Sequence, residues 1–278
     1  MKARIKFSKC GSMRFIGHLD VMRYFQKAFR RAGIPISYSQ GFSPHQLMSF
    51  ASPLGIGLSS DAEYMDLTLD DCKDPAEMVA RMNAQMNEEI RVQELTILSE
   101  DAKPSMAMLA ACDYMVAVKA GKESFLLPEQ FDKTGKYASL EELLTSFLAQ
   151  DEIEILKKTK RSESLVNIRE NIYVLSQNKD QFEAATRDHG TVSCLDGSSD
   201  TPILYMQLTA GSIVNIKPEL VLQALADFAG QNYDPLVYQI HRMEMYGDAE
   251  GKKGEIHTIH SEIPCRLVPL SSFNAAIQ

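Results

Sequence analysis

Hydrophobic and polar residues follow strand and helix periods along roughly the first third of the chain. Alternation of the two classes predicts half-buried strands, and apolar residues three or four apart predict amphipathic helices. Gly33 and Pro35 end the first helix, and Asp74 is placed to cap the second. The predicted elements are strands at 3–9, 36–39, 46–51, 63–69 and 90–98, and helices at 17–32 and 75–87. This order is β-α-β-β-α-β with one extra short strand.

The second half of the chain repeats the same order. The predicted strands are 113–120, 152–158, 165–175, 203–209 and 236–245, with helices at 139–149 and 217–229 and loops at 178–201 and 247–254. We therefore expect an α+β protein built from two tandem ferredoxin-like (β-α-β-β-α-β) units. The expected domains are residues 1–98, which are basic, residues 113–246, which are more acidic, and a C-terminal extension at 247–278.

Charge is distributed unevenly between the two ends of the chain. Residues 1–50 contain nine Lys or Arg and one acid, Asp20, whereas residues 51–278 contain 20 basic and 36 acidic side chains. The basic segment carries +8 and the remainder −16, which gives the net charge of −8. Phosphates are bound by clustered cations rather than by net charge, so the pattern indicates a local docking site for a polyanion.

The first predicted helix places its cations on one side. On a helical wheel an apolar stripe spans an arc of about 140°, and a basic row lies within about 60° on the other side. The stripe contains Leu19, Met22, Phe25, Phe29 and Ala32, and the row contains Arg23, Lys27 and Arg30. Asp20 is placed to orient a neighbouring cation, and Arg14 and Arg31 are expected to join the row. The row is either a solvated helix face or a surface that contacts phosphates.

The loop at residues 38–45 brings together aromatic, imidazole and hydroxyl groups. Aromatic faces stack on unpaired bases, and hydroxyls and loop amides bind phosphate or ribose. Tyr38, Phe42 and His45 are therefore candidates for a base or ribose pocket in single-stranded RNA, and an ordinary turn anchored by Phe42 is the alternative. Gly41 and Pro44 are expected to shape the turn.

Two histidines are candidates for catalysis. His18 follows Gly17, to which we give a structural role, at the start of the first helix, and His45 lies in the polar loop. Either imidazole is able to act as a general acid or base in RNA cleavage. A structural role for both is the alternative, and a metal site formed by His18, Asp20 and His45 has no spacing rule behind it.

Several function classes are excluded by the sequence pattern. The chain has no run of about 18 apolar residues and no hydrophobic signal region at its start, so we expect a cytoplasmic protein without a membrane partner. It contains no Cys-x-x-Cys pair, and residues 49–59 lack the residue order of a phosphate loop. We therefore expect no zinc site, no other metal site and no nucleotide cofactor.

Several segments near the start of the chain resemble the signature of the radical-SAM-associated domain of unknown function. The segments are 6–9, 13–20, 30–35, 38–45, 49–51 and 63–64, and the similarity is thin beyond about residue 110. Members of that family stand alone or are fused behind cobalamin-binding-type radical SAM proteins, often encoded near ribosomal protein and ribonuclease genes. The resemblance implies a radical SAM protein as partner. This chain has no Cys-x-x-x-Cys-x-x-Cys triplet to hold an iron–sulfur cluster itself.

A looser resemblance is to the repeat-processing endoribonucleases of CRISPR systems. These enzymes also pair two ferredoxin-like units and cleave RNA without metal, commonly with a histidine near the first helix. His18 or His45 with Tyr38 would be the corresponding residues here. The chain departs from that pattern because no lysine follows His45 until Lys73, which weakens the case for cleavage and leaves RNA binding intact.

These observations predict an RNA-binding accessory protein, without catalysis or cofactor of its own, that works with a radical SAM enzyme on tRNA, rRNA or the ribosome. Arg14, Arg23, Lys27, Arg30 and Arg31 are its expected phosphate contacts. The first alternative is a metal-independent endoribonuclease that uses His45 or His18. The second is a protein-docking module for the radical SAM partner that does not contact RNA.

Overall fold

The fold was obtained as a computed structural model that describes residues 1–134, 136–158, 163–190, 201–250 and 265–273. Its strands are β1 Lys2–Lys9, β2 Met48–Phe50, β3 Ser59–Thr68, β4 Ile90–Ile97, β5 Leu109–Val118, β6 Glu154–Lys158, β7 Glu163–Asn167, β8 Ile172–Ser176, β9 Thr201–Thr209, β10 Tyr238–Asp248 and β11 Leu267–Pro269. Its α-helices are α1 His18–Arg31, α2 Pro75–Asn83, α3 Ser105–Met108, α4 Pro128–Thr134, α5 Leu140–Leu148, α6 Lys179–Ala185 and α7 Pro218–Ala229. Short 3₁₀ turns lie at Gly11–Phe15, Arg169–Asn171, Pro235–Val237 and Leu270–Ser272.

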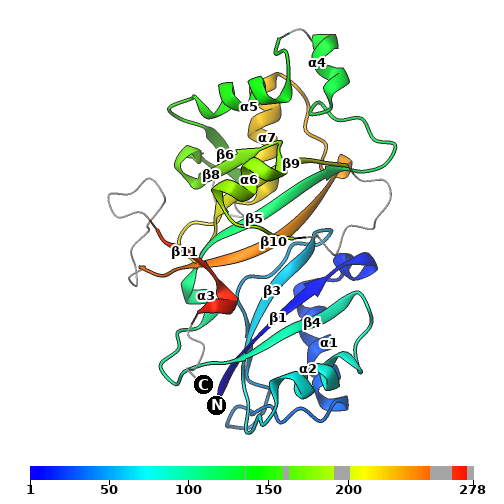
Figure 1. The fold of residues 1–278 in the computed structure, drawn as a ribbon, viewed down its shortest axis with the longest axis vertical. Coiled ribbons are helices and arrows are strands. Elements are labelled where there is room, and N and C mark those ends of the chain that lie inside the picture. Colours follow the sequence, from blue (N-terminus) through cyan, green and yellow to red (C-terminus); the bar gives the residue numbers. More distant parts are fainter. Residues whose placement is uncertain (135, 159–162, 191–200, 251–264, 274–278) are drawn as a thin grey trace.

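One large sheet runs through the elongated molecule (Figure 1). Within the described residues its strand order is β4-β1-β3-β10-β5-β9-β8, with β2 added to β3 and β11 added to β10, and β6 and β7 form a separate two-stranded sheet. Neighbouring strands are antiparallel except for β3 and β10, which are parallel and pair at Ser59 with His241 and at Ser60 with Arg242. The predicted α+β class is confirmed.

The two halves of the sheet have the same arrangement. In the first half the order is β4-β1-β3-β2, and in the second half it is β10-β5-β9-β8, with every neighbouring pair antiparallel. The β3–β10 ladder joins these halves into one continuous sheet, a connection that the sequence pattern did not indicate.

Helices α1 and α2 cover one face of the first half. The buried side chains of α1 are Val21, Phe25, Ala28 and Phe29, and they pack with alternate residues of β1 and with Met78 and Met82 of α2. The predicted apolar stripe is wrong at Leu19, which is exposed. The smaller side chains of Val21 and Ala28 define the buried side instead, and this rotates the stripe away from Leu19.

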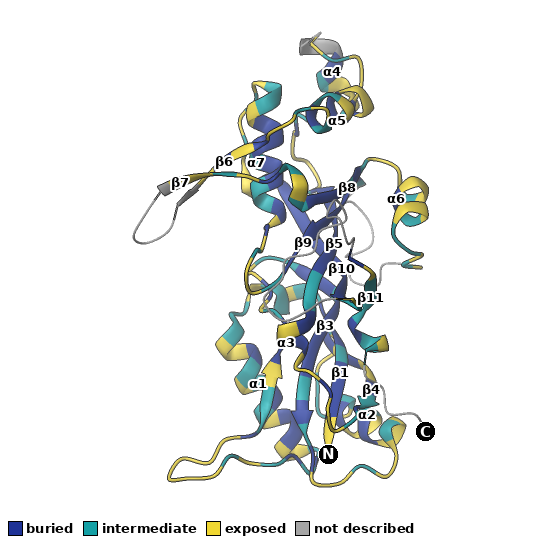
Figure 2. Cartoon of the chain, turned by 90° about the vertical axis from the view of Figure 1, so that its left-hand side faces the viewer, coloured by how far each residue is buried: buried dark blue, intermediate teal, exposed yellow. Residues whose placement is uncertain are grey.

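Helices α5 and α7 supply a second core with the strands of the second half. Leu143, Leu144 and Phe147 of α5 and Val221, Leu222 and Leu225 of α7 belong to one buried cluster with residues of β5, β9 and β10. α7 begins at Pro218 and ends at Ala229, and the C-cap residue Gly230 has a φ of 70° in the left-handed region. Figure 2 shows the buried residues concentrated along the sheet and on the inner sides of these helices.

Several segments differ from the sequence prediction. The predicted strand at 36–39 forms only isolated bridges, Ile36 with Leu69 and Tyr38 with Gln46, and α3, α4 and β11 were not predicted. The segment predicted as a single strand at 165–175 is β7, a 3₁₀ turn and β8. The predicted loop at 178–201 contains α6, which Asn178 caps by accepting a hydrogen bond from the Gln181 N–H at 3.0 Å. Residues 191–200 of that loop and residues 251–254 of the predicted loop at 247–254 lie outside the described ranges.

The chain returns to the sheet near its end. β11 pairs with β10, and Arg4 on β1 donates a hydrogen bond from Nη1 to the Leu270 carbonyl at 2.9 Å. Gly247 leaves room for Phe273, because a Cβ at that position would lie 2.8 Å from the Phe273 ring. The segment at 265–273 therefore contacts both halves of the molecule.

Candidate functional site

The outward face of α1 carries exposed cations. Arg23, Lys27 and Arg30 point away from the side of the helix that packs on β1. Arg23 Nη1 lies 3.3 Å from Asp20 Oδ1, and both side chains are largely exposed. Within the described ranges neither Lys27 nor Arg30 forms a salt bridge, so this face keeps an excess of positive charge.

The other two predicted phosphate contacts have local partners. Arg31 is exposed and donates from Nη2 to the Gln85 carbonyl at 2.6 Å. Arg14 is half-buried and its guanidinium lies 4.9 Å from the centre of the Phe15 ring. The structure therefore groups three of the five predicted cations on the outward face of α1 and holds Arg14 and Arg31 at its margins.

Hydrogen bonds between Ser39 and His45 close the base of the loop after α1, and the tip of the loop is exposed. The Ser39 N–H donates to the His45 carbonyl at 2.8 Å, the His45 N–H donates to Ser39 Oγ at 3.1 Å, and Ser39 Oγ lies 2.8 Å from His45 Nδ1. Gly41 has a φ of 110°, which favours glycine, and Pro44 is exposed. Phe42 at the tip is fully exposed, with a relative accessibility of 111%, rather than anchored in the core.

Gln46 joins this loop to α1. Its Nε2 donates to the Gln26 carbonyl at 3.4 Å and to the Tyr38 hydroxyl at 3.3 Å. Gln46 therefore connects Tyr38 to the backbone of α1 at Gln26. We call the α1 cations Arg23, Lys27 and Arg30 together with Tyr38, Phe42 and His45 the α1–loop surface.

His18 and His45 have different surroundings. His18, the first residue of α1 after the N-cap Gly17, packs its ring edge-on against Phe50 at 4.8 Å between centroids. It lines a pocket at the start of α1, whereas His45 is exposed and bonded to Ser39. The structure does not bring the two imidazoles together. Over the described ranges no group of three His, Cys, Asp or Glu side chains is suited to a metal ion.

Charged groups that the sequence analysis did not identify lie beneath His18. Lys9 and Glu63 line the same pocket, and Lys9 Nζ donates to the Ile16 carbonyl at 3.1 Å. Burial lowers the pKa of Lys9 and raises the pKa of Glu63, the latter against the opposing charge of Arg242. Arg242 Nη1 donates to Glu63 Oε1 at 2.9 Å. Glu63 lies on the same face of β3 as the apolar residues Met65 and Leu67. This alternation was the signal in the sequence that indicated a buried Glu63.

A second buried network connects the sheet to the segment after α6. Asp113 Oδ2 accepts a hydrogen bond from the Tyr246 hydroxyl at 2.6 Å and lies 2.8 Å from His189 Nε2. Burial raises the pKa of Asp113, and the bonded His189 opposes this. Glu244 Oε2 binds both Lys6 Nζ at 2.9 Å and Arg187 Nη1 at 3.0 Å. These contacts link β1, β5, β10 and the end of α6, which is a structural role.

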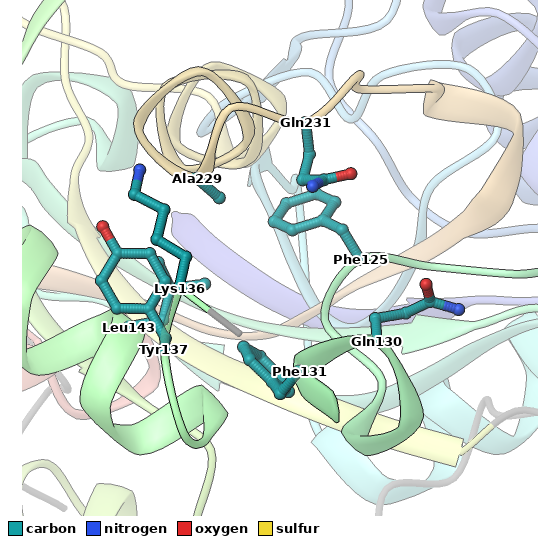
Figure 3. Close-up of a pocket in the computed structure, with 8 residues that line it drawn as sticks. All are labelled: Phe125, Gln130, Phe131, Lys136, Tyr137, Leu143, Ala229 and Gln231. Carbon is teal, nitrogen blue, oxygen red and sulfur yellow. The ribbon is translucent and has the colours of Figure 1, made fainter. Parts of the chain in front are cut away.

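A further pocket of about 290 Å³ lies among α4, α5 and the end of α7 (Figure 3). Lys136 Nζ donates to the Phe228 carbonyl at 2.9 Å and lies 5.1 Å from the centre of the Tyr137 ring. Lys136 therefore donates a hydrogen bond to one of the carbonyl groups at the C-terminal end of α7 that have no partner within the helix. Figure 3 shows Gln130 and Gln231 beside Phe125, away from Lys136 and Tyr137. The polar groups do not converge on a common point, so we assign this pocket no ligand.

None of the helices in the described part of the chain has the length and apolar character needed to cross a membrane. The residues considered above define an α+β protein with an exposed basic helix and an adjoining aromatic loop.

Comparison with known proteins places this α+β protein in a family. Residues 2–218 match the family model DUF2344, described as an uncharacterized protein conserved in bacteria, and the chain belongs to this family. No curated protein matches the chain. A solved structure described as the X-ray crystal structure of a heavy metal efflux pump aligns at 10% identity and a TM-score of 0.21. The alignment covers 87% of this chain and 28% of that one, and a similarity this low carries no argument about fold or function.

Proposed function

We propose that this protein is an RNA-binding accessory protein that works with a radical SAM enzyme in the modification of RNA, either tRNA or rRNA, or of the ribosome. The observation that carries the proposal is the outward face of α1, where Arg23, Lys27 and Arg30 are exposed and only Arg23 has an acidic partner among the described residues. Unbalanced cations on one helix face suit phosphates. The radical SAM partner rests on the resemblance of the segments between positions 6 and 64.

We also interpret the two halves as ferredoxin-like units. This interpretation is supported by the shared antiparallel orders β4-β1-β3-β2 and β10-β5-β9-β8, with α1 and α2 in the first half and α5 and α7 in the second. In this arrangement each half contributes one helix-covered sheet, and the α1–loop surface lies on the solvent side of the first helical layer.

RNA binding should depend on the charge of α1. For the purified protein and total cellular RNA, three phosphate contacts predict a slope of about −2 for log K against log salt, or a loss of about 20-fold between 50 and 200 mM. The Arg23→Glu/Arg30→Glu variant is expected to lose most of this slope. Filter binding or fluorescence anisotropy across a salt series measures the slope for the wild type and for the variant.

The matched control is Lys122→Glu/Lys217→Glu. It changes the net charge by the same amount at two exposed lysines of the second half. It should keep the wild-type slope. If the control and the α1 variant lose affinity equally, or if the wild type does not bind RNA, the proposed function is wrong.

Phe42 should contribute to binding of unpaired bases. Because its ring is fully exposed at the loop tip, Phe42→Ala is expected to weaken binding of a 12-residue oligouridine by about 5- to 150-fold, the range expected for stacking of one base on an aromatic ring. Phe42→Trp should retain binding, since tryptophan also offers a stacking face. Equal binding by the wild type and Phe42→Ala would show that Phe42 does not contact the bases. That result would not bear on the phosphate contacts of α1.

A further inference from the structure

One ring nitrogen of His45 is held by the loop, and the other is left to solvent. Ser39 Oγ lies 2.8 Å from His45 Nδ1 and also accepts a hydrogen bond from the His45 N–H at 3.1 Å. His45 is exposed, and within the described residues its Nε2 has no hydrogen-bond partner. Nδ1 is therefore engaged in either tautomer, and Nε2 is the nitrogen that a ligand reaches.

His45 belongs to the fixed base of its loop. Tyr38, the other titratable side chain of the loop, forms a β-bridge with Gln46, and Gln46 is buried and bonded to the Gln26 carbonyl of α1. Phe42 lies at the exposed tip, whereas His45 is the direct neighbour of the buried Gln46. The imidazole is therefore presented in one place before a ligand arrives, which lowers the cost of ordering it on binding.

The charged groups of the elements around the loop do not neutralise a protonated His45. Helix α1 presents the cations of the α1–loop surface, and its one acid, Asp20, is paired with Arg23. Asp70, which follows β3, accepts a hydrogen bond from the Ser37 hydroxyl at 2.5 Å, and β2 has no titratable side chain. His45 forms no salt bridge with any described part of the chain. The opposing charge for an imidazolium at this position therefore has to come from a bound anion.

We propose that His45 couples RNA binding to the uptake of one proton, because its protonated Nε2 donates to a phosphate oxygen and adds a contact to those of α1. This inference rests on the proposed RNA binding and specifies how that site is regulated. Imidazole changes its charge between pH 5 and 8, and an oxyanion that accepts its N–H favours the charged form. The complex then binds more protons than the free protein and RNA, so affinity increases as the pH falls.

Binding of a 12-residue oligouridine at pH 7.5 and at pH 5.5 tests this proposal. The probe carries no terminal phosphate, so neither its bases nor its backbone titrate between these two values. For the wild type we expect the Kd to fall by about 3- to 5-fold at pH 5.5, near the upper value for one exposed ion pair. The slope of log K against log salt should become steeper by about 0.7, as expected for one further phosphate contact in a single strand. Fluorescence anisotropy across a salt series at each pH measures the Kd and the slope.

Two variants of His45 separate its charge from its shape. His45→Gln keeps a polar side chain that does not titrate, so its affinity and salt slope should be the same at both pH values. His45→Arg is charged throughout, so at pH 7.5 it should bind about as tightly as the wild type does at pH 5.5. The matched control is His18→Gln, because His18 packs against Phe50 at the start of α1. This control should keep the pH dependence of the wild type.

The outcomes distinguish the role of His45 from RNA binding itself. An equal gain in affinity at pH 5.5 for the wild type and His45→Gln, or no gain for the wild type, would overturn the proposed role of His45. RNA binding has its own criterion at pH 7.5, which is the salt slope that Arg23→Glu/Arg30→Glu loses. If the wild type shows that slope without a pH dependence, only the role of His45 is wrong. If the wild type binds RNA at neither pH, both proposals are wrong.

Discussion

Replacing Arg242 with leucine is expected to lower the free energy of unfolding by about 3–5 kcal/mol at pH 8, because it leaves the buried carboxylate of Glu63 without its partner. The side chains of Arg242 and Glu63 are only 5% and 4% exposed, and they join β10 to β3 across the boundary between the two halves. An uncompensated charge in such surroundings is unfavourable. Urea unfolding monitored by circular dichroism measures the loss.

The stability lost in Arg242→Leu should increase with pH. Burial already raises the pKa of Glu63 above its ordinary value of 4.5, and removing Arg242 raises it further. The folded state then binds a proton more readily than the unfolded state, so stability falls as pH rises through this window, by up to about 1.4 kcal/mol per pH unit. Arg242→Leu should therefore be less destabilising at pH 5 than at pH 8.

Removing both charges provides the control. Glu63→Leu/Arg242→Met replaces the buried pair with apolar side chains of similar size, and such replacements of buried ion pairs are often neutral. We expect the double variant to recover at least half of the stability lost in Arg242→Leu and to lose the pH dependence that protonation of Glu63 causes. For Arg242→Leu, a loss below about 1 kcal/mol, or the same loss at pH 5 and pH 8, would contradict the described pair.

Replacing Phe25 with alanine is expected to cost about 3–5 kcal/mol, the range for large-to-small changes in a packed core. Phe25 is fully buried at the centre of α1, and its ring lies 4.8 Å from Phe7, 5.5 Å from Phe29 and 6.2 Å from Phe50. The opposite face of the helix carries Arg23, Lys27 and Arg30, so loosening this contact should also reduce the ordered presentation of the cations.

Thermal unfolding measures the stability of Phe25→Ala, and two further variants serve as comparisons. Phe25→Leu keeps most of the buried volume and should lose less stability than Phe25→Ala. Phe42→Ala removes a phenylalanine that is fully exposed, and it should change the free energy of unfolding by less than about 0.5 kcal/mol. If Phe25→Ala proves as stable as Phe42→Ala, α1 does not pack on the sheet through this face.

Helices with local signals were predictable from the sequence. The start of α2 is encoded by Asp74, whose Oδ1 accepts from the Ala76 N–H at 2.8 Å, and the end of α7 by Gly230 in a left-handed conformation. α6 has an N-cap in Asn178 but no apolar period, because it is seven residues long and Phe182 is its only buried side chain. One buried residue produces no periodicity, and a short helix of this kind depends on tertiary packing.

The candidate site was predictable to a similar extent. The outward direction of Arg23, Lys27 and Arg30 follows from helical spacing, because the three side chains share one side of the wheel. The exposure of Leu19 did not follow, since a wheel shows which residues lie together and not which side meets the sheet. The pairing of Glu63 with Arg242 joins residues that are 179 positions apart, and no local pattern records such a partner.

The sequence by itself determined the α+β class, the position of most helices and strands, and the concentration of positive charge within residues 1–50. Backbone preferences, capping residues and hydrophobic periods act over a few residues, so they are readable in the chain. Only the tertiary structure decided that β3 and β10 join the halves, that Phe42 is exposed, and that Glu63 meets Arg242. These features depend on which faces of distant segments meet, and that choice is made by packing of the whole chain rather than by any one segment of it.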